Sequence, residues 1–237
     1  MRKLETKYAE LSTVKLAYSE YGNGENLLLL HGNSANKSIF GKYQTEYLKN
    51  FHTYAIDSRG HGKSISVDEK YTIKQYSEDV IEFCRYLNID KAFVLGYSDG
   101  GNISLFLAAQ DPKRFSKIYA ISPNYLACGT TDSSLSFLKK IYRMLNFMNR
   151  IGLNTKKAIM RFDLMLNDIG LSKQQLQSIS TQVRIAYAQK DMIKHEHIIE
   201  ISQLIPDASL KKIDGCTHIS EFKSSELISD MQHFFAV

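Results

Sequence analysis

The chain has 237 residues, 43% hydrophobic and 23% charged, a composition typical of a globular protein long enough for one large core. No apolar stretch is long enough to span a bilayer and no apolar leader follows the first residues, so we expect neither stable membrane insertion nor a signal peptide. The three cysteines lie far apart, which favours reduced thiols in the cytoplasm over disulfides or a zinc site. The net charge of +5 comes without a nucleic-acid motif or an aromatic-basic face, so nucleic acid is not an expected partner.

Short apolar runs alternate with helical patterns in the first half of the chain. This order predicts an α/β fold with a mostly parallel central sheet flanked by helices. In such a sheet, ligands bind at the carboxyl ends of the strands. The predicted strands are residues 4–10 and 13–21 as an antiparallel edge, then 27–30, 53–56, 91–95 and 116–121, and the predicted helices are 38–49, 72–87 and 102–110.

The alternation stops at residue 123 and resumes after residue 180. Residues 124–180 show helical stripes without a strand pattern, which predicts an inserted helical cap over a core built from 1–123 and 181–237. Beyond the cap, the predicted elements are a strand at 183–188, a helix at 193–204, a strand at 209–213 and a helix at 220–235.

The predicted cap has an unusual composition. It holds eight Lys or Arg and three Asp, so it carries the net charge of the whole chain. Its first apolar stripe is marked by Leu138, Ile141, Leu145 and Met148. We expect an apolar, methionine-rich face of the cap to face the sheet, with Met144 and Met148 lining an adaptable substrate pocket. The basic side chains are either a solvated outer face or a surface that attracts anionic substrates or lipids.

The segment Gly96-Tyr97-Ser98-Asp99-Gly100 lies between a predicted strand and a predicted helix. A serine on such a tight turn takes a positive φ, and the residues two before and two after it come together, so both must be small. Gly96 and Gly100 meet this need. The turn would raise the Ser98 hydroxyl above the sheet, next to a helix N-terminus. The same pentapeptide also occurs as an ordinary glycine-rich turn, so other motifs of the chain are needed to indicate a catalytic role for this serine.

Three further loops follow predicted strands: His-Gly-Asn-Ser at 31–34, Asp-Ser-Arg-Gly-His-Gly-Lys-Ser at 57–64 and Gly-Cys-Thr-His at 215–218. With the serine turn and in this order, they resemble the α/β-hydrolase family over nearly the whole chain. The turn that holds Ser98, called here the elbow, has Asp after the serine and in this is similar to capped serine esterases and lactonases, including the biphenyl-hydrolase-like group. Lys-Asp-Met-Ile at 190–193 looks like the family's acid loop, although Gln189 stands where the family often has Gly.

The resemblance implies a catalytic triad in the order Ser98, Asp191, His218. His218 would take the proton of Ser98, and Asp191 would orient and stabilise the imidazolium. The implied oxyanion hole consists of the backbone N–H groups of Asn33 and Asp99. The other candidates for the acid are Asp168, Asp207 and Asp214.

The Asp99 side chain has two interpretations. It is either a carboxylate favoured by the helix dipole or a group that attracts a cationic substrate. We also expect Tyr97 to contact the substrate. His31, Asp57, Arg59 and His61 are expected to brace the loops under the site.

The predicted function is hydrolysis of a small carboxylic ester, thioester or lactone through an acyl-enzyme on Ser98. The alternatives are C–C bond hydrolysis of ring-opened diketones and ligand binding without catalysis, because a fold does not fix a function. No metal and no cofactor are expected. The expected partner is a small ester-like molecule, and the expected state is a monomer or a homodimer.

Overall fold

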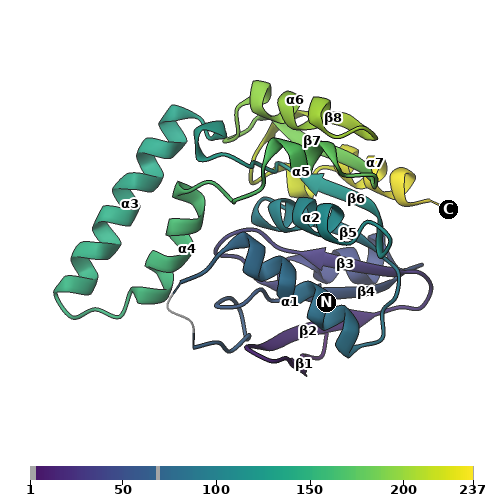
Figure 1. The fold of residues 1–237 in the computed structure, drawn as a ribbon, viewed down its shortest axis with the longest axis horizontal. Coiled ribbons are helices and arrows are strands. Elements are labelled where there is room, and N and C mark those ends of the chain that lie inside the picture. Colours follow the sequence, from purple (N-terminus) through teal and green to yellow (C-terminus); the bar gives the residue numbers. More distant parts are fainter. Residues whose placement is uncertain (1–3, 68–69, 237) are drawn as a thin grey trace.

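An eight-stranded sheet forms the centre of the protein (Figure 1), seen in a computed structural model that describes residues 4–67 and 70–236. The strand order is β1-β2-β4-β3-β5-β6-β7-β8. β1 pairs with β2 and β2 with β4 in antiparallel fashion, and all other neighbours are parallel. The predicted sheet, with its antiparallel edge, is therefore confirmed. The strands are β1 Lys7–Glu10, β2 Lys15–Tyr21, β3 Asn26–Leu30, β4 His52–Ile56, β5 Ala92–Tyr97, β6 Phe115–Ile121, β7 Gln182–Lys190 and β8 Ala208–Thr217.

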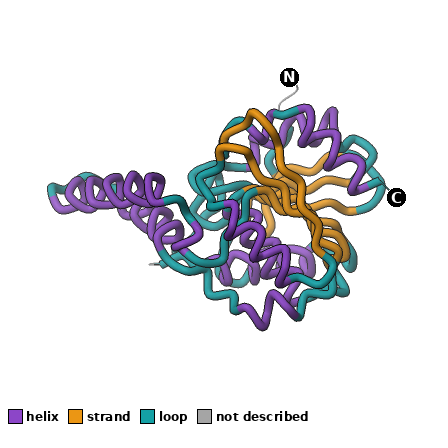
Figure 2. The backbone as a smooth tube through the Cα atoms, turned by 90° about the horizontal axis from the view of Figure 1, so that it is seen from above, coloured by secondary structure: helices purple, strands orange, loops and turns teal. Residues whose placement is uncertain are grey.

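Helices cover both faces of the sheet (Figure 2). On one face, α1 (Ile73–Tyr86), α2 (Asp99–Gln110) and α6 (His195–Leu204) close a large apolar core. On the other face, α7 (Ser225–Phe235) packs beside Phe40 and Tyr43 over a second core. The central strands are buried on both sides, which explains why they read as continuous apolar runs.

The predicted helix at 38–49 is only partly correct. The chain instead forms a 3-10 turn over Lys37–Phe40 and a π-helical turn over Tyr43–Tyr47. Gln44, in the wider turn, is fully buried, and its side-chain amide donates to backbone oxygens of β2 and β4. We attribute the irregular winding to this bonding, because a buried amide must find partners.

Three helices lie between β6 and β7: α3 (Asp132–Arg150), α4 (Lys156–Leu166) and α5 (Lys173–Gln177). The structure describes every residue of this segment, and none of them lies in a named strand. α5 begins at the predicted capping box, in which Ser172 and Gln175 bond reciprocally. α3 and α4 form a helical arm that extends beyond the sheet (Figures 1 and 2). We propose 124–180 as the bounds of the inserted segment. The predicted core, 1–123 and 181–237, includes residues 1–3, 68–69 and 237, which lie outside the described residues.

The expectation that the α3 stripe faces the sheet is wrong. Met144 is 54% exposed and Met148 is half-buried on the projecting arm, so neither lines a pocket over the sheet. α3 packs against α4 instead, and Leu138 is its one buried side chain. In α4, by contrast, Met160 and Leu164 join the main core. Helical periodicity shows which residues share a face but not what that face contacts.

In the described part of the chain, we find no helix with the length and apolarity needed to cross a membrane.

Candidate active site

Ser98 lies on the turn between β5 and α2 in the strained conformation that the sequence predicts. Its φ is 54° and its ψ is −115°, and its backbone N–H donates to the Ile121 oxygen at 2.8 Å. A Cβ added to Gly96 would lie 2.1 Å from the Gly100 oxygen, and one added to Gly100 would lie 1.9 Å from the Leu30 oxygen. The turn therefore tolerates only glycine at both positions.

The structure brings Ser98, Asp191 and His218 together from three separate loops. The Nε2 atom of His218 lies 3.2 Å from Oγ of Ser98, and its Nδ1 atom lies 2.7 Å from Oδ1 of Asp191. Asp191 directly follows β7 and His218 directly follows β8, so both come from carboxyl ends of parallel strands. This is the hydrogen-bonded arrangement that an activated serine needs.

The competing carboxylates are engaged elsewhere. The carboxylate of Asp168 accepts a bond from the backbone N–H of Ala127, and Asp214 pairs with Lys212. Asp207 follows α6, at the opposite end of β8 from His218. Of the four candidates, Asp191 is the one whose carboxylate bonds Nδ1 of His218.

Asp191 is held as a carboxylate by several donors. Besides His218, its oxygens accept from the backbone N–H groups of Ala188 and Ile193, both at 3.1 Å, and from Oγ of Ser122 at 2.5 Å. Burial alone would raise the pKa of Asp191, but the bonds from His218 and Ser122 outweigh it and lower that pKa. The group is charged and fixed in place.

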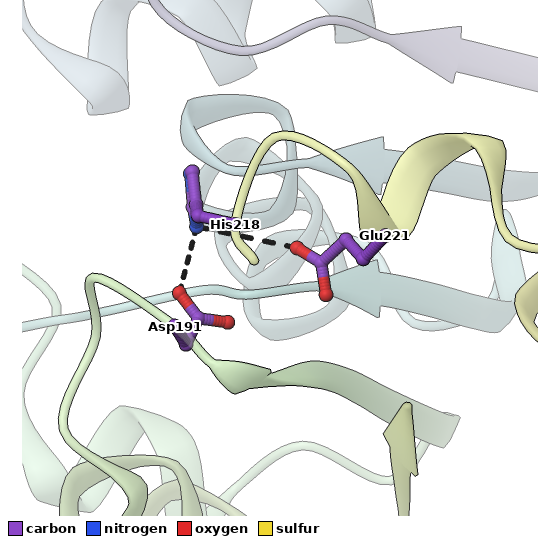
Figure 3. Close-up of side chains that lie close together, drawn as sticks. All are labelled: Asp191, His218 and Glu221. Atoms are coloured by element: carbon purple, nitrogen blue, oxygen red, sulfur yellow. Dashed lines mark hydrogen bonds and ion pairs between the residues drawn. The ribbon is translucent and has the colours of Figure 1, made fainter. Parts of the chain in front are cut away.

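Two residues that the sequence analysis missed complete this cluster. Ser122 follows β6 with φ 51°, and its Oγ lies 2.6 Å from Oε1 of Glu221. Glu221 is fully buried, and this oxygen lies 4.0 Å from Nδ1 of His218 (Figure 3). The one available signal was a glutamate three residues after the candidate histidine, which is too common to single out.

The loop that holds Gly32 and Asn33 lies directly against the elbow. A Cβ on Gly32 would lie 3.0 Å from the Ser98 Cβ, so the backbone of Gly32, the residue before Asn33, is close to the serine side chain. Asp99 is the first residue of α2, where backbone N–H groups have no partner inside the helix. The Nδ2 atom of Asn33 donates to Oδ2 of Asp99 at 2.9 Å and to the Arg161 oxygen of α4 at 2.7 Å. Asn33 thus ties α4 to the elbow.

The Asp99 side chain is buried. Burial raises its pKa to about 6, against the opposing effects of the Asn33 bond and of His218. Because Asn33 already occupies this carboxyl group, its environment supports the interpretation as a helix N-terminal group over one that attracts a cationic substrate.

Tyr97 contacts the histidine loop. Its hydroxyl donates to the His218 backbone oxygen at 2.8 Å, and its ring packs against His218 and Phe222. The ring also borders a hollow of about 790 Å³ beside the loop that holds Asn33. We therefore assign Tyr97 first to positioning His218. The hollow is lined mainly by apolar and aromatic side chains, among them Ile39, Tyr43, Tyr47, Ile219, Phe222 and Ile228.

The loops under the site are braced as expected. Arg59 is buried and bonds Asp79 through two nitrogens, at 2.8 and 2.6 Å. His31 and His61 are buried and accept bonds from the backbone N–H groups of Ser58 and Ser34. Burial lowers the pKa values of both rings, that of His61 to about 3, so they act here as neutral acceptors.

Among the described residues, one group of side chains could bring metal-ligating atoms together: Asp191, His218 and Glu221. The Nδ1 atom of His218 and Oδ1 of Asp191 are already bonded to each other at 2.7 Å, which leaves no room for an ion between them.

The comparisons with known proteins show the family of the chain. The family model of the alpha/beta hydrolase fold matches residues 25–167, which is more than half of the chain. The chain therefore belongs to the alpha/beta hydrolase fold family.

Individual relatives are more distant. The chain is 28% identical over 116 residues to 2-(acetamidomethylene)succinate hydrolase of Mesorhizobium japonicum, covering 49% of this chain and 42% of that protein. It is 29% identical over 142 residues to monoacylglycerol lipase abhd6-A of Xenopus laevis, covering 57% of this chain and 42% of that one. These alignments span less than half the length of either relative.

Solved structures match over the whole fold. Est816, described as an N-acyl homoserine lactone degrading enzyme, superposes with a TM-score of 0.78 at 22% identity, covering 97% of this chain and 100% of that one. The enol-lactonase from Burkholderia xenovorans superposes with a TM-score of 0.77 at 19% identity, covering 96% and 99%. At this level of identity the likeness concerns the fold.

Proposed function

We propose that the protein is a serine hydrolase that cleaves small carboxylic esters, thioesters or lactones. One observation carries the proposal: Ser98 Oγ, the His218 ring and the Asp191 carboxylate form a continuous hydrogen-bonded chain at the carboxyl edge of the sheet. The strained elbow supports it, because a serine held at positive φ between two obligatory glycines serves no packing purpose.

The mechanism follows from these contacts. Oγ of Ser98 attacks the carbonyl carbon while Nε2 of His218 takes its proton. The same nitrogen then gives that proton to the leaving alcohol, thiol or ring oxygen, and the acyl group remains on Ser98. Water activated by His218 releases the acid and restores the serine. Asp191 holds the imidazole tautomer and stabilises the imidazolium in both halves.

The developing oxyanion needs donors placed before the reaction begins. The backbone N–H groups of Asn33 and Asp99 flank the nucleophile, and each such donor is worth about 3 kcal/mol of barrier. Asn33 is fixed by its bonds to Asp99 and Arg161, so its loop is already ordered. The apolar hollow between Asn33 and Tyr97 offers space for an acyl or alkyl group beside the site.

A substrate panel tests this proposal. Purified protein is assayed with a nitrophenyl ester, an acyl thioester, a lactone and a ring-opened diketone, and Ser98→Ala measures the background. We expect turnover of at least one of the first three, with Ser133→Ala on exposed α3 as active as wild type. Turnover confined to the diketone would establish C–C hydrolysis instead. Thermal stabilisation by these compounds without any turnover would indicate a ligand-binding protein.

A further inference from the structure

Ser122 lies between two carboxyl groups. Its Oγ is 2.5 Å from Oδ2 of Asp191 and 2.6 Å from Oε1 of Glu221. A hydroxyl carries one proton, so it donates to one of these oxygens only. The other short contact requires a proton from the carboxyl side, and one of the two acids is therefore protonated.

The surroundings decide which acid carries the proton. Asp191 accepts from His218 and from two backbone N–H groups, as a carboxylate does. Glu221 is fully buried and its Oε2 atom has no hydrogen-bond partner, so a charge there would be uncompensated. Burial and the charge of Asp191 raise the pKa of Glu221 to about 9, although the Ser122 bond lowers it.

We propose that Glu221 is a neutral positioning acid, which donates its proton to Ser122 Oγ while Ser122 donates to Asp191. The proposal rests on the triad of the proposed function. The chain of bonds gives Asp191 a fourth donor and keeps its other oxygen directed at His218. An ionised Glu221 would break the chain and place a second negative charge 4.0 Å from Nδ1 of His218.

The titratable groups facing Glu221 come from four elements. They are Asp191 after β7, His218 after β8, Tyr97 at the end of β5 and Tyr43 in the turn after β3. Burial raises the pKa of each tyrosine, and the charge of Glu221 would raise both further. The tyrosines therefore stay neutral, and Asp191 is the anion that opposes ionisation of Glu221.

Three variants test the role through kinetics. Glu221→Gln keeps the shape and a donor to Ser122, so we expect kcat within about threefold of wild type near pH 7. Wild type should lose activity as pH rises through about 9, and Glu221→Gln should not. Glu221→Ala and Ser122→Ala remove the donor chain, and we expect kcat to fall about tenfold with little change in KM. A Glu221→Gln variant as impaired as Glu221→Ala would overturn the proposal, because activity would then depend on the negative charge of Glu221.

An infrared titration separates this inference from the hydrolase proposal. The wild type minus Glu221→Gln difference spectrum at pH 7 should contain the carbonyl stretch of a protonated carboxylic acid, lost as pH rises through about 9. A carboxylate signal at pH 7 would overturn the neutral acid even in an active enzyme. The acid band in a protein that hydrolyses nothing would refute the proposed function and leave the protonation state of Glu221 standing.

A second, independent observation concerns the helical arm formed by α3 and α4. Large apolar side chains are exposed along it: Phe137 and Phe147 are each 62% exposed and Met144 is 54% exposed. These three lie on one flank of α3 at helical spacing, and Ile151 and Leu153 continue the apolar surface at the arm's tip. The arm protrudes from the body in both views (Figures 1 and 2).

The net positive charge of the arm indicates what kind of partner its apolar surface contacts. Residues 132–166 contain seven Lys or Arg and two Asp, which equals the net charge of the whole chain. Lys139, Lys140 and Arg143 are exposed beside the apolar flank. Two such arms would repel each other, which disfavours pairing between copies, whereas an anionic lipid surface attracts the basic side chains and accepts the apolar ones.

We infer that the arm docks on anionic membrane surfaces, with Phe137 and Phe147 entering the interface. Co-sedimentation compares vesicles of phosphatidylcholine alone with vesicles containing phosphatidylserine. We expect binding to the anionic vesicles only, weakened at least tenfold by raising salt from low to physiological levels, by Phe137→Ser/Phe147→Ser and by Lys140→Glu/Arg143→Glu. Tyr86→Ser, at an exposed aromatic residue that ends α1 outside the arm, is the matched control and should bind as wild type does.

Two results would overturn the lipid assignment. One is no binding to the anionic vesicles at low salt. The other is a concentration-dependent dimer in solution that Phe137→Ser/Phe147→Ser abolishes, because the apolar flank would then belong to a contact between copies.

Discussion

Replacing Asp191 with asparagine is expected to lower kcat by about 10⁴-fold while the protein stays folded. An amide keeps the size of the side chain but favours the wrong tautomer of His218 and cannot stabilise the imidazolium. The substitution alters the bond between Oδ1 of Asp191 and Nδ1 of His218, which is 2.7 Å long in wild type. The measurement is kcat and KM on the best substrate of the panel, and we expect KM to change much less than kcat.

Asp214→Asn provides the matched control. Asp214 lies only four residues before His218, but its carboxylate is exposed and pairs with Lys212. We expect this variant to retain wild-type activity. The account would fail if Asp191→Asn retained more than a tenth of the activity, or if Glu221→Gln fell as far as Asp191→Asn is expected to fall. The latter result would transfer the role of triad acid to Glu221.

The substitution Gly100→Ala is expected to destabilise the protein by at least about 3 kcal/mol. The new Cβ would lie 1.9 Å from the backbone oxygen of Leu30 and 2.5 Å from its carbonyl carbon, so the elbow and β3 would have to separate. Backbone in the middle of the sheet cannot yield as a flexible side chain can. The free energy of unfolding, measured in urea, checks this expectation.

Gly101→Ala serves as the comparison for this experiment. Its added Cβ would meet the Ile121 oxygen at 3.2 Å, which a small shift can relieve. We expect it to destabilise much less than Gly100→Ala. Equal stability of Gly100→Ala and wild type would mean that the elbow is looser than its contacts indicate.

The sequence predicts the sheet and the serine turn from local patterns, and the resemblance to the α/β-hydrolase family implies which residues form the triad. A buried strand followed by a glycine-flanked serine can turn in few ways, and parallel strands put their carboxyl ends at one edge. The loops holding Asp191 and His218 follow such strands, so their convergence with Ser98 follows from the order of the elements.

Other features depend on contacts that periodicity does not encode. The apolar stripe of α3 does not reveal that this helix packs against α4, nor that Met144 is exposed. The bond from the Tyr97 hydroxyl to the His218 backbone oxygen is such a contact, and the expected contact of Tyr97 with substrate stays a prediction. Glu221 reaches the cluster only through the 3-10 turn after His218 and the strained turn at Ser122, neither of which the sequence pattern predicts.

The central claim is that Ser98 is an activated nucleophile, and labelling with a fluorophosphonate tests it most directly. The probe reacts with an activated serine through displacement of fluoride and needs no knowledge of the substrate. Intact-mass analysis should show one adduct on wild type and none on Ser98→Ala, with peptide mapping placing the adduct on Ser98. Absence of an adduct on folded wild type, or equal labelling of both proteins, would contradict the account.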